Sequence, residues 1–350
     1  MAFSLCNRLP CADGVRWYCR RDDHSSTRPV RIASAIAGSV TNSVEQQGRG
    51  FRFQLSIGAK VIPHPDKVEK GGEDAFFISD FDGGVFGIAD GVSGWAEENV
   101  DPALFSKELV NHLAESVTSE EVPGDPKVLL GKAHAATSSK GAATAIVATL
   151  LGAEGLLRVA SVGDCGLRLV RDGKVVFATS PQQHYFDCPY QFSSEVGGQT
   201  AEDSAVHEIT IVAGDVVVMG SDGLFDNVFD RDIAATVTLF QVTDVESAER
   251  TATALATMAN RNSRDPKYES PYSTEAIYQG FDVPIWRKLL GEKLTGGKLD
   301  DITVLVGAVA VTEIVEVEGE KDEQSQSSFQ KSETHDGSSS EEAVVTNEGI

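Results

Sequence analysis

The chain has 350 residues, a formal net charge of −23 at pH 7 and a pI of about 4.6. Its hydrophobic content of 41% is enough for a packed core, but no apolar run approaches the roughly 20 residues that span a bilayer. An acidic chain is a poor candidate for binding the phosphate backbone of nucleic acids, which needs clustered Lys and Arg. The five cysteines show no CxxC spacing, which excludes a recognisable zinc site or disulfide framework. We therefore expect no nucleic-acid partner and no membrane span.

The two ends of the chain differ in composition from its middle. Residues 1–50 hold seven Arg, no Lys and four acids, with many Ser, Thr and Ala. This composition predicts an organelle transit peptide, with a disordered N-terminus as the alternative. Residues 316–350 hold ten acids against two Lys and predict an acidic disordered tail, with or without a function of its own. Residues 51–315 remain as the folded domain.

The apolar core pattern begins at Phe51–Ile62. Two shorter runs follow, Ala75–Ser79 and Val85–Ala89, and the sequence FDGG between them predicts an antiparallel hairpin. The acids Glu73 and Asp74 open the first of these runs. The second ends abruptly in ADG, which places a carboxylate at the end of a buried strand.

Three helices are expected in the middle of the chain. Asp-Pro pairs at 101–102 and 125–126 predict two helix starts, because Pro is favoured at the first helical position. The first of these helices places apolar residues on one face, namely Phe105, Leu109 and Leu113. The pattern of Thr243–Asn260 predicts the third helix.

Further hairpins are predicted later in the chain. An Asp-Gly pair joins Leu167–Val170 to Val175–Ala178, and an Ala-Gly pair joins Val206–Val212 to Val216–Met219. Val216–Met219 and Ile302–Val306 are apolar on both faces, so both faces must be covered. We therefore predict an α+β fold, a four-layer αββα sandwich with two packed, mainly antiparallel sheets between helical layers.

Acidic residues stand at the edges of several of these strands. A single Asp-Gly is an ordinary turn, but several converging carboxylates repel one another unless a cation binds between them. The candidate ligands are all oxygen donors, and no Cys or His accompanies them at a metal-binding spacing. This indicates Mg²⁺ or Mn²⁺ rather than Zn²⁺. The candidates at these strand edges are Glu73, Asp90, Asp164, Asp222 and Asp300.

An ordered set of motifs extends this interpretation. The stretches GGEDAFF, GIADGVSGW, GAATAIVA, SVGDCG, MGSDGLFDNV and KLDDITVLV occur in that order within residues 55–311. The chain resembles the type 2C, or PPM, metal-dependent Ser/Thr protein phosphatases. DGVSGW and QQHYFDCPYQ are similar to the organelle branch of that family.

The resemblance implies a mechanism and a site. A water activated by two ions, Mn²⁺ or Mg²⁺, would hydrolyse phosphoserine and phosphothreonine, with Asp90, Glu73 and Asp222 as catalytic residues. A third, weaker ion is implied at Asp164. The implied metal-site residues are Asp90, which bridges the ions, Gly91 through its carbonyl, Asp222, Asp300, Asp164 and, through water, Glu73.

The resemblance also implies a setting. Substrates would be phosphoproteins of the thylakoid membrane, above all those of the photosystem II core. A monomer in the chloroplast stroma, acting at the thylakoid surface, is expected.

Two positions depart from the family pattern. Many members have Arg where this chain has Glu69, so the substrate phosphate must be bound otherwise, with Lys67 or Lys70 as candidates. Many also have His where this chain has Val92, which leaves open the proton donor to the leaving oxygen. A water on the metal and the branch-specific His184 are alternatives, although a structural role suits that loop histidine better.

Two other functions compete with this interpretation. A cysteine phosphatase would use Cys165 with Arg171, but Gly166–Val170 alternates like a strand and does not form the required phosphate loop. A catalytically silent type 2C fold could instead bind phosphoproteins as a regulatory module. Loss of the metal-site Asp residues would indicate that role, and they are present.

Overall fold

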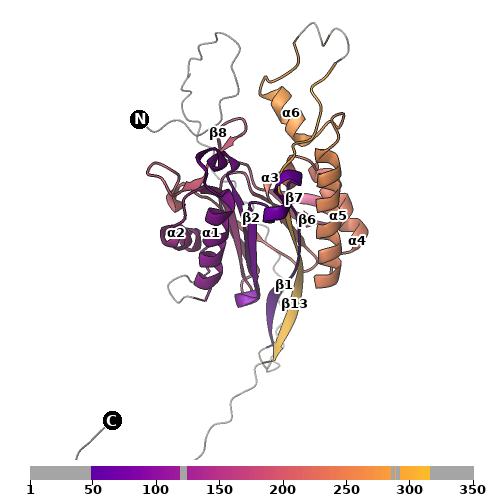
Figure 1. The fold of residues 1–350 in the computed structure, drawn as a ribbon. Coiled ribbons are helices and arrows are strands. Elements are labelled where there is room, and N and C mark those ends of the chain that lie inside the picture. The colour runs from indigo at the N-terminus through magenta and orange to yellow at the C-terminus, as the bar shows by residue number, and fades with distance from the viewer. Residues whose placement is uncertain (1–48, 119–123, 285–287, 289–291, 316–350) are drawn as a thin grey trace, which may run out of the picture. The chain divides into compact units, whose positions relative to one another are not determined.

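The computed structural model describes residues 49–118, 124–284, 288 and 292–315 (Figure 1). Apart from residues 49 and 50, the predicted transit peptide lies outside the described residues, as does the acidic tail. Among the described helices, none combines the length and the apolar character that a bilayer crossing would require.

One sheet has five strands and is antiparallel throughout. Its longest pair runs in register from Arg49 opposite Val315 to Ile62 opposite Ile302. In spatial order the strands are β1 (Arg49–Ile62), β13 (Ile302–Val315), β12 (Val216–Gly220), β6 (Gly166–Arg171) and β7 (Lys174–Ala178).

The second sheet has six strands and is also antiparallel. In spatial order its main path is β11 (Ala205–Thr210), β5 (Leu156–Val162), β4 (Ala142–Leu151), β3 (Val85–Gly91) and β2 (Asp74–Ser79), and β10 (Phe192–Ser193) pairs with β4. A separate two-stranded ribbon is formed by β8 (Gln183–Tyr185) and β9 (Cys188–Pro189).

Helices cover the outer face of each sheet (Figure 1). The six-stranded sheet contacts α1 (Pro102–Ser116) and α2 (Pro126–Ala136), and the five-stranded sheet contacts α4 (Asp230–Phe240) and α5 (Val245–Ser263). Further helices within the described ranges are α3 (Asp222–Phe225), α6 (Pro271–Tyr278) and the 3₁₀ helices η1 (Pro65–Lys70), η2 (Phe81–Gly83), η3 (Ser93–Glu98) and η4 (Ala201–Asp203).

The helix starts follow the expected cap chemistry. The Asp101 side chain accepts from the backbone N–H of Ala103 at 3.2 Å, and Asp125 accepts from that of Lys127 at 2.9 Å. Both side chains therefore accept hydrogen bonds from backbone N–H groups that have no partner inside the helix. The predicted third helix begins two residues later than expected, at Val245, because Asp244 caps it.

Three buried clusters separate the four layers. One contains side chains of both sheets, such as Phe86, Ile146 and Leu305, and lies between them. Another joins the six-stranded sheet to α1 and α2, and the third joins the five-stranded sheet to α4 and α5. The predicted αββα sandwich is therefore confirmed.

Two of the three predicted hairpins are confirmed. β2 pairs with β3, and β6 pairs with β7 through Asp172 and Gly173, whose positive φ values of 49° and 72° are those that a tight hairpin turn needs.

The predicted pairing of Val206–Val212 with Val216–Met219 is wrong. β11 lies at the edge of the six-stranded sheet, whereas β12 lies at the centre of the other sheet. Every residue of β12 is buried, which suits the centre of a sheet, whereas β11 is exposed on one side, which suits an edge. The Ala-Gly turn therefore connects two different sheets and does not close a hairpin.

Candidate active site

Carboxylates from both sheets meet where their strands end. Asp90 lies near the end of β3, directly opposite Asp74 at the start of β2. Asp222 follows β12 as the first residue of α3, and Asp300 stands two residues before β13. Because β12 and β13 are neighbours in one sheet and β2 and β3 in the other, the packed sheets bring these four residues to a common end.

The electrostatics of Asp90 show how close this grouping is. Removal from water raises the pKa of Asp90 well above its ordinary value, and the charges of neighbouring carboxylates raise it further. Those neighbours are Asp74, Asp222, Asp300 and Asp164. The structure therefore brings together the four aspartates that the sequence singled out, and adds Asp74.

Asp74 is a member of the group that the sequence analysis named but did not include among the site residues. It is buried, and its Oδ2 accepts from the hydroxyls of Ser221 at 2.9 Å and Thr303 at 2.7 Å. Burial and the charge of Asp301 raise its pKa to about 7. Counting residue pairs back along the β2–β3 hairpin places Asp74 opposite Asp90, so the sequence did contain the signal.

Glu73 points to a different set of partners. Its Oε2 accepts from the ammonium of Lys67 at 2.7 Å and from the hydroxyl of Ser93 at 2.6 Å. Its backbone N–H donates to Asp301 at 3.0 Å. The Glu73 carboxylate therefore lies at the edge of the group, beside a lysine.

Gly91 is required by close packing. A Cβ atom at this position would lie 2.8 Å from the carbonyl oxygen of Pro102 and 2.9 Å from that of Glu73. The Gly91 N–H donates to the same Glu73 carbonyl at 3.2 Å. Glycine after Asp90 therefore lets the end of β3 pass between α1 and the start of β2.

Lys298 lies among the aspartates, and the sequence analysis did not identify it. Its ammonium lies 2.6 Å from Asp222 Oδ2, 3.2 Å from Asp226 Oδ2, 3.1 Å from Asp187 Oδ1 and 4.0 Å from Asp300 Oδ2. Burial lowers the pKa of Lys298, but these carboxylates outweigh burial and leave it well above its ordinary value. Lys298 and Asp226 both lie inside stretches already quoted, KLDDITVLV and MGSDGLFDNV.

A second lysine approaches from η1. Lys67 Nζ lies 2.7 Å from Glu73, 3.2 Å from Asp301 and 4.0 Å from Asp300 Oδ1. Asp300 is therefore flanked by two ammonium groups, one near each of its oxygens. Of the two candidates for phosphate binding, Lys67 is at the carboxylate group, whereas Lys70 is an exposed residue at the end of η1.

His184 packs within its own loop region. Its ring centroid lies 4.5 Å from that of Tyr190, and its Nε2 lies 3.3 Å from Gln199 Nε2. These contacts support the structural role that the sequence analysis preferred over a role as proton donor.

The cysteine mechanism is excluded by geometry. Cys165 is buried, its Sγ lies 3.2 Å from Thr144 Oγ1, and burial raises the pKa of its thiol well above the ordinary value. Arg171 lies at the far end of β6, six residues after Cys165, which corresponds to roughly 20 Å along an extended strand. It forms a two-point ion pair with Asp215 there.

The donor chemistry of the group suits hard divalent cations. Within the described part of the chain, Asp74 Oδ1 and Asp222 Oδ1 are buried without a hydrogen-bond partner. Across all the described residues, no three His, Cys, Asp or Glu side chains are already arranged around a common point. The aspartates at these strand ends therefore offer the hard oxygen donors that Mg²⁺ and Mn²⁺ prefer, two of them with an oxygen that no described residue contacts.

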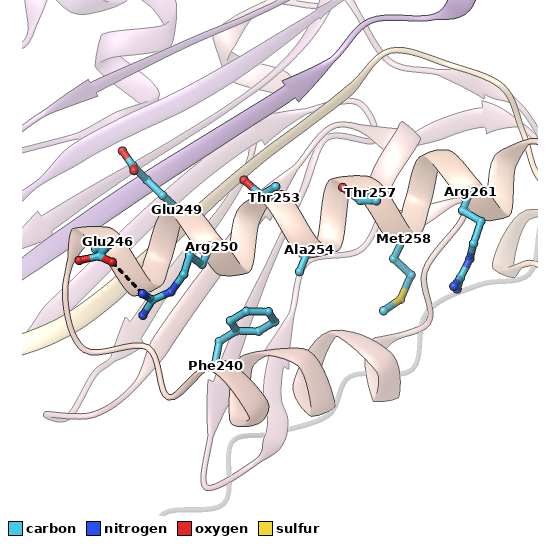
Figure 2. A pocket seen from close by; sticks show the side chains of 9 residues that line it. All are labelled: Phe240, Glu246, Glu249, Arg250, Thr253, Ala254, Thr257, Met258 and Arg261. Atoms are coloured by element: carbon cyan, nitrogen blue, oxygen red, sulfur yellow. Dashed lines mark hydrogen bonds and ion pairs between the residues drawn. The ribbon is translucent and has the colours of Figure 1, made fainter.

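The groove found on the protein surface does not coincide with this site. An open groove of about 590 Å³ runs along the outer face of α5 (Figure 2), and its lining includes Phe240, Met258 and Arg261. Figure 2 shows Arg250 directed at Glu246, with which it pairs at 2.8 Å. None of the clustered aspartates lines this groove, so the site is recognised by its chemistry.

Comparison with known proteins gives close relatives. The chain is 57% identical over 257 residues to probable protein phosphatase 2C 26 of Arabidopsis thaliana, a match covering 73% of this chain and 84% of the relative. It is 52% identical over 278 residues to probable protein phosphatase 2C 1 of Oryza sativa subsp. japonica, covering 79% and 82%. The X-ray structure of the photosystem II phosphatase PBCP matches with a TM-score of 0.69 and 54% identity, covering 73% of this chain and 98% of that one. No family model matches the chain.

Proposed function

The chain belongs to the protein phosphatase 2C family and is a protein-serine/threonine phosphatase, and on that premise we propose that it uses two divalent cations, Mn²⁺ or Mg²⁺, to dephosphorylate photosystem II phosphoproteins. The observation that carries the metal proposal is the meeting of carboxylates from both sheets at one strand end. Asp74 lies opposite Asp90 and bonds to Ser221 beside Asp222, and Asp74 and Asp222 each have an oxygen without a partner among the described residues. Such a group is stable with every member ionised only when cations bind it.

The proposed roles follow the contacts of each side chain. Asp90, whose pKa is raised by the charges of four neighbouring carboxylates, would hold the cations together with Asp222 and Asp300, which come from the other sheet. The remaining proposed participants are the Gly91 carbonyl, Asp164 for a third, weaker ion, and Glu73 for the nucleophilic water.

When bound, the cations supply an activated water and offset charge on the phosphoryl oxygens. Glu73 is held by Ser93 and Lys67, so its carboxylate is fixed to accept a hydrogen bond from the water. Lys67 binds the substrate phosphate as a point charge, in place of the family's Arg. Its side chain is 19% exposed, and its ammonium lies 4.0 Å from Asp300.

The photosystem II proposal is supported by the 54% identity to PBCP. We propose the chloroplast stroma as the location, with action at the thylakoid surface and residues 1–50 as the transit peptide. A fluorescent protein fused to residues 1–50 should enter chloroplasts, and fluorescence confined to the cytosol would contradict the transit proposal alone.

Phosphorylated thylakoid membranes test the substrate. The full chain with Mn²⁺ should remove phosphate from photosystem II core subunits faster than from the other phosphoproteins of the same membranes. Equal rates on all of them would contradict the substrate proposal. Full activity in excess chelator would contradict the metal proposal, and recovery when Mn²⁺ or Mg²⁺ is restored is the matched control.

A further inference from the structure

Lys298 occupies an unusual place for a lysine. Its ammonium lies 2.6 Å from Asp222 and 4.0 Å from Asp300, both proposed metal ligands, and its side chain is only 22% exposed. Lys67 also lies 4.0 Å from Asp300, but its closest carboxylates are Glu73 and Asp301 and not Asp222. The Lys298 ammonium thus supplies positive charge at the place where the proposed function requires a divalent cation.

The contact with Asp222 uses one carboxylate oxygen and leaves the other free. Oδ2 accepts from Lys298, and Oδ1 has no partner in the described part of the chain. A cation bound by Asp222 and the Lys298 ammonium would share one counter-charge and repel each other. Metal binding must therefore weaken the Lys298–Asp222 contact.

The backbone at Lys298 is fixed independently of its side chain. Its N–H donates to Asn227 Oδ1 at 3.0 Å, and its carbonyl accepts from Asn227 Nδ2 at 2.8 Å. A Cβ at Gly297 would lie 2.4 Å from the carbonyl oxygen of Asn262, so this segment packs tightly. Replacing the Lys298 side chain should leave the loop in place, which makes the ammonium the variable part.

We propose that Lys298 is an internal counter-cation, which stabilises the carboxylate centre without metal and competes with the divalent cation for Asp222. The inference rests on the proposed metal function. It assigns to this chain a residue that sets metal affinity without being a ligand.

The ammonium has partners outside the proposed ligand set. Asp187, in the turn between β8 and β9, lies 3.1 Å away and is 44% exposed, and the Tyr272 ring centroid lies 5.5 Å away. Lys298 can keep these contacts when it loses Asp222. Metal occupancy should therefore shift the ammonium toward the β8–β9 turn.

Lys298→Met tests the proposal through binding rather than turnover. Titration calorimetry of the metal-free full chain with Mn²⁺ should show binding about tenfold tighter or more, because one nearby positive charge is removed. In chelator the same variant should melt at a lower temperature than the wild type, because the carboxylates lose their counter-charge. Affinity and metal-free stability therefore change in opposite directions.

Lys293→Met is the matched control. Lys293 is an exposed lysine of the same segment, 3.2 Å from Glu269, and its loss changes the net charge by the same amount. It should leave both measurements near the wild-type values. Lys298→Arg, which keeps the charge, should keep the weaker metal affinity.

Unchanged or weaker Mn²⁺ binding by Lys298→Met would overturn the proposal. If that variant does not fold, Lys298→Gln, whose amide can still donate to Asp222, must show the same opposite changes. A wild type that binds no Mn²⁺ would instead overturn the proposed metal function. Normal wild-type binding with no effect of Lys298 would overturn this inference alone.

Discussion

Two buried aspartates flank the same strand, β12, and their surroundings differ. Asp215, before the strand, accepts from Arg171 Nε and Nη2, both at 2.7 Å, and from the Val212 N–H at 2.9 Å. Asp222, after the strand, has Lys298 on one oxygen and no partner for the other among the described residues. A buried carboxylate with complete partners stabilises the fold, whereas one with incomplete partners is available to a ligand.

The difference extends to the neighbours of each residue. Around Asp215 the charges are balanced by a single arginine. Around Asp222 several carboxylates share two lysines, and burial together with mutual repulsion raises the pKa of Asp90, Asp164 and Asp300. A satisfied ion pair and an unsatisfied acidic centre thus lie at opposite ends of the five-residue strand β12.

The largest expected effect is at the acidic centre. Asp90→Asn and Asp222→Asn should each lower kcat/KM with Mn²⁺ by a factor of about 10²–10³ or more, because each loses charge stabilisation at the reacting centre. The kcat/KM of the double variant should be little lower than that of either single variant, since both changes disable the same centre. Steady-state kinetics on a phosphothreonine peptide measures this.

The stability of the same variants distinguishes function from folding. In chelator, Asp90→Asn should melt at the same temperature as the wild type or higher, because repulsion among the carboxylates decreases. If it melts far lower without metal yet stays active when folded, Asp90 is a turn-forming residue and the comparison with Asp215 fails.

The opposite pattern is expected at the other end of β12. Asp215→Asn should lower the free energy of unfolding by about 2 kcal/mol, less than for a fully buried pair because Arg171 is 34% exposed. The turnover of the folded variant should stay close to wild type, since Asp215 lies away from the centre. Urea unfolding together with an Arg171→Met double-mutant cycle measures the coupling, and additive effects of the two changes would contradict it.

The pH dependence of stability should differ between satisfied and unsatisfied carboxylates. Burial first, and then neighbouring charge, raises the pKa of Asp74 to about 7 and that of Asp164 to about 8. Between pH of about 4 and 8 the metal-free folded state thus binds more protons than the unfolded chain. The free energy of unfolding in chelator should therefore fall as pH rises through this window, and saturating Mn²⁺ should remove the fall.

Glu108 on α1 supplies a control of opposite sign. Hydrogen bonds from Ser139 and Ser138 lower its pKa to about 2. Its contribution to stability is present above the unfolded value of 4.5 and is lost as pH falls toward 2. Glu108→Gln should therefore change the stability curve without altering the fall between pH 4 and 8. Metal-free stability that rises between pH 5 and 8 would contradict the account of Asp74 and Asp164.

The smallest effect is expected for Cys165. Cys165→Ser should retain most of the wild-type turnover, because the thiol lies in the core between the sheets and Thr144 can pair with the new hydroxyl. A stability loss of about 1 kcal/mol is expected from burying a more polar group. Complete loss of activity in a folded variant would revive the cysteine mechanism.

Much of the fold followed from local patterns in the sequence. The strands around ADG and SDG, the helices that begin after Asp101 and Asp125, and the hairpin at Asp172 depend on residue periodicity, caps and turn chemistry, which act within a few residues. Four aspartates of the site, Asp90, Asp164, Asp222 and Asp300, were found the same way, because each stands at the edge of an apolar run. Such features are determined by neighbouring residues, so one sequence is enough to identify them.

Partner choice was decided only by the tertiary structure. Position beside an apolar run does not separate Asp215 from Asp222, since each stands next to the same strand. Their partners differ because Arg171 and Lys298 arrive from distant segments. The pairing of β12 was wrongly predicted for the same reason, because burial on both faces of a strand is satisfied by elements far away in the chain. Periodicity and turn residues fix what each segment is, but burial and charge compensation depend on which segments meet, and that is a property of the whole packed chain.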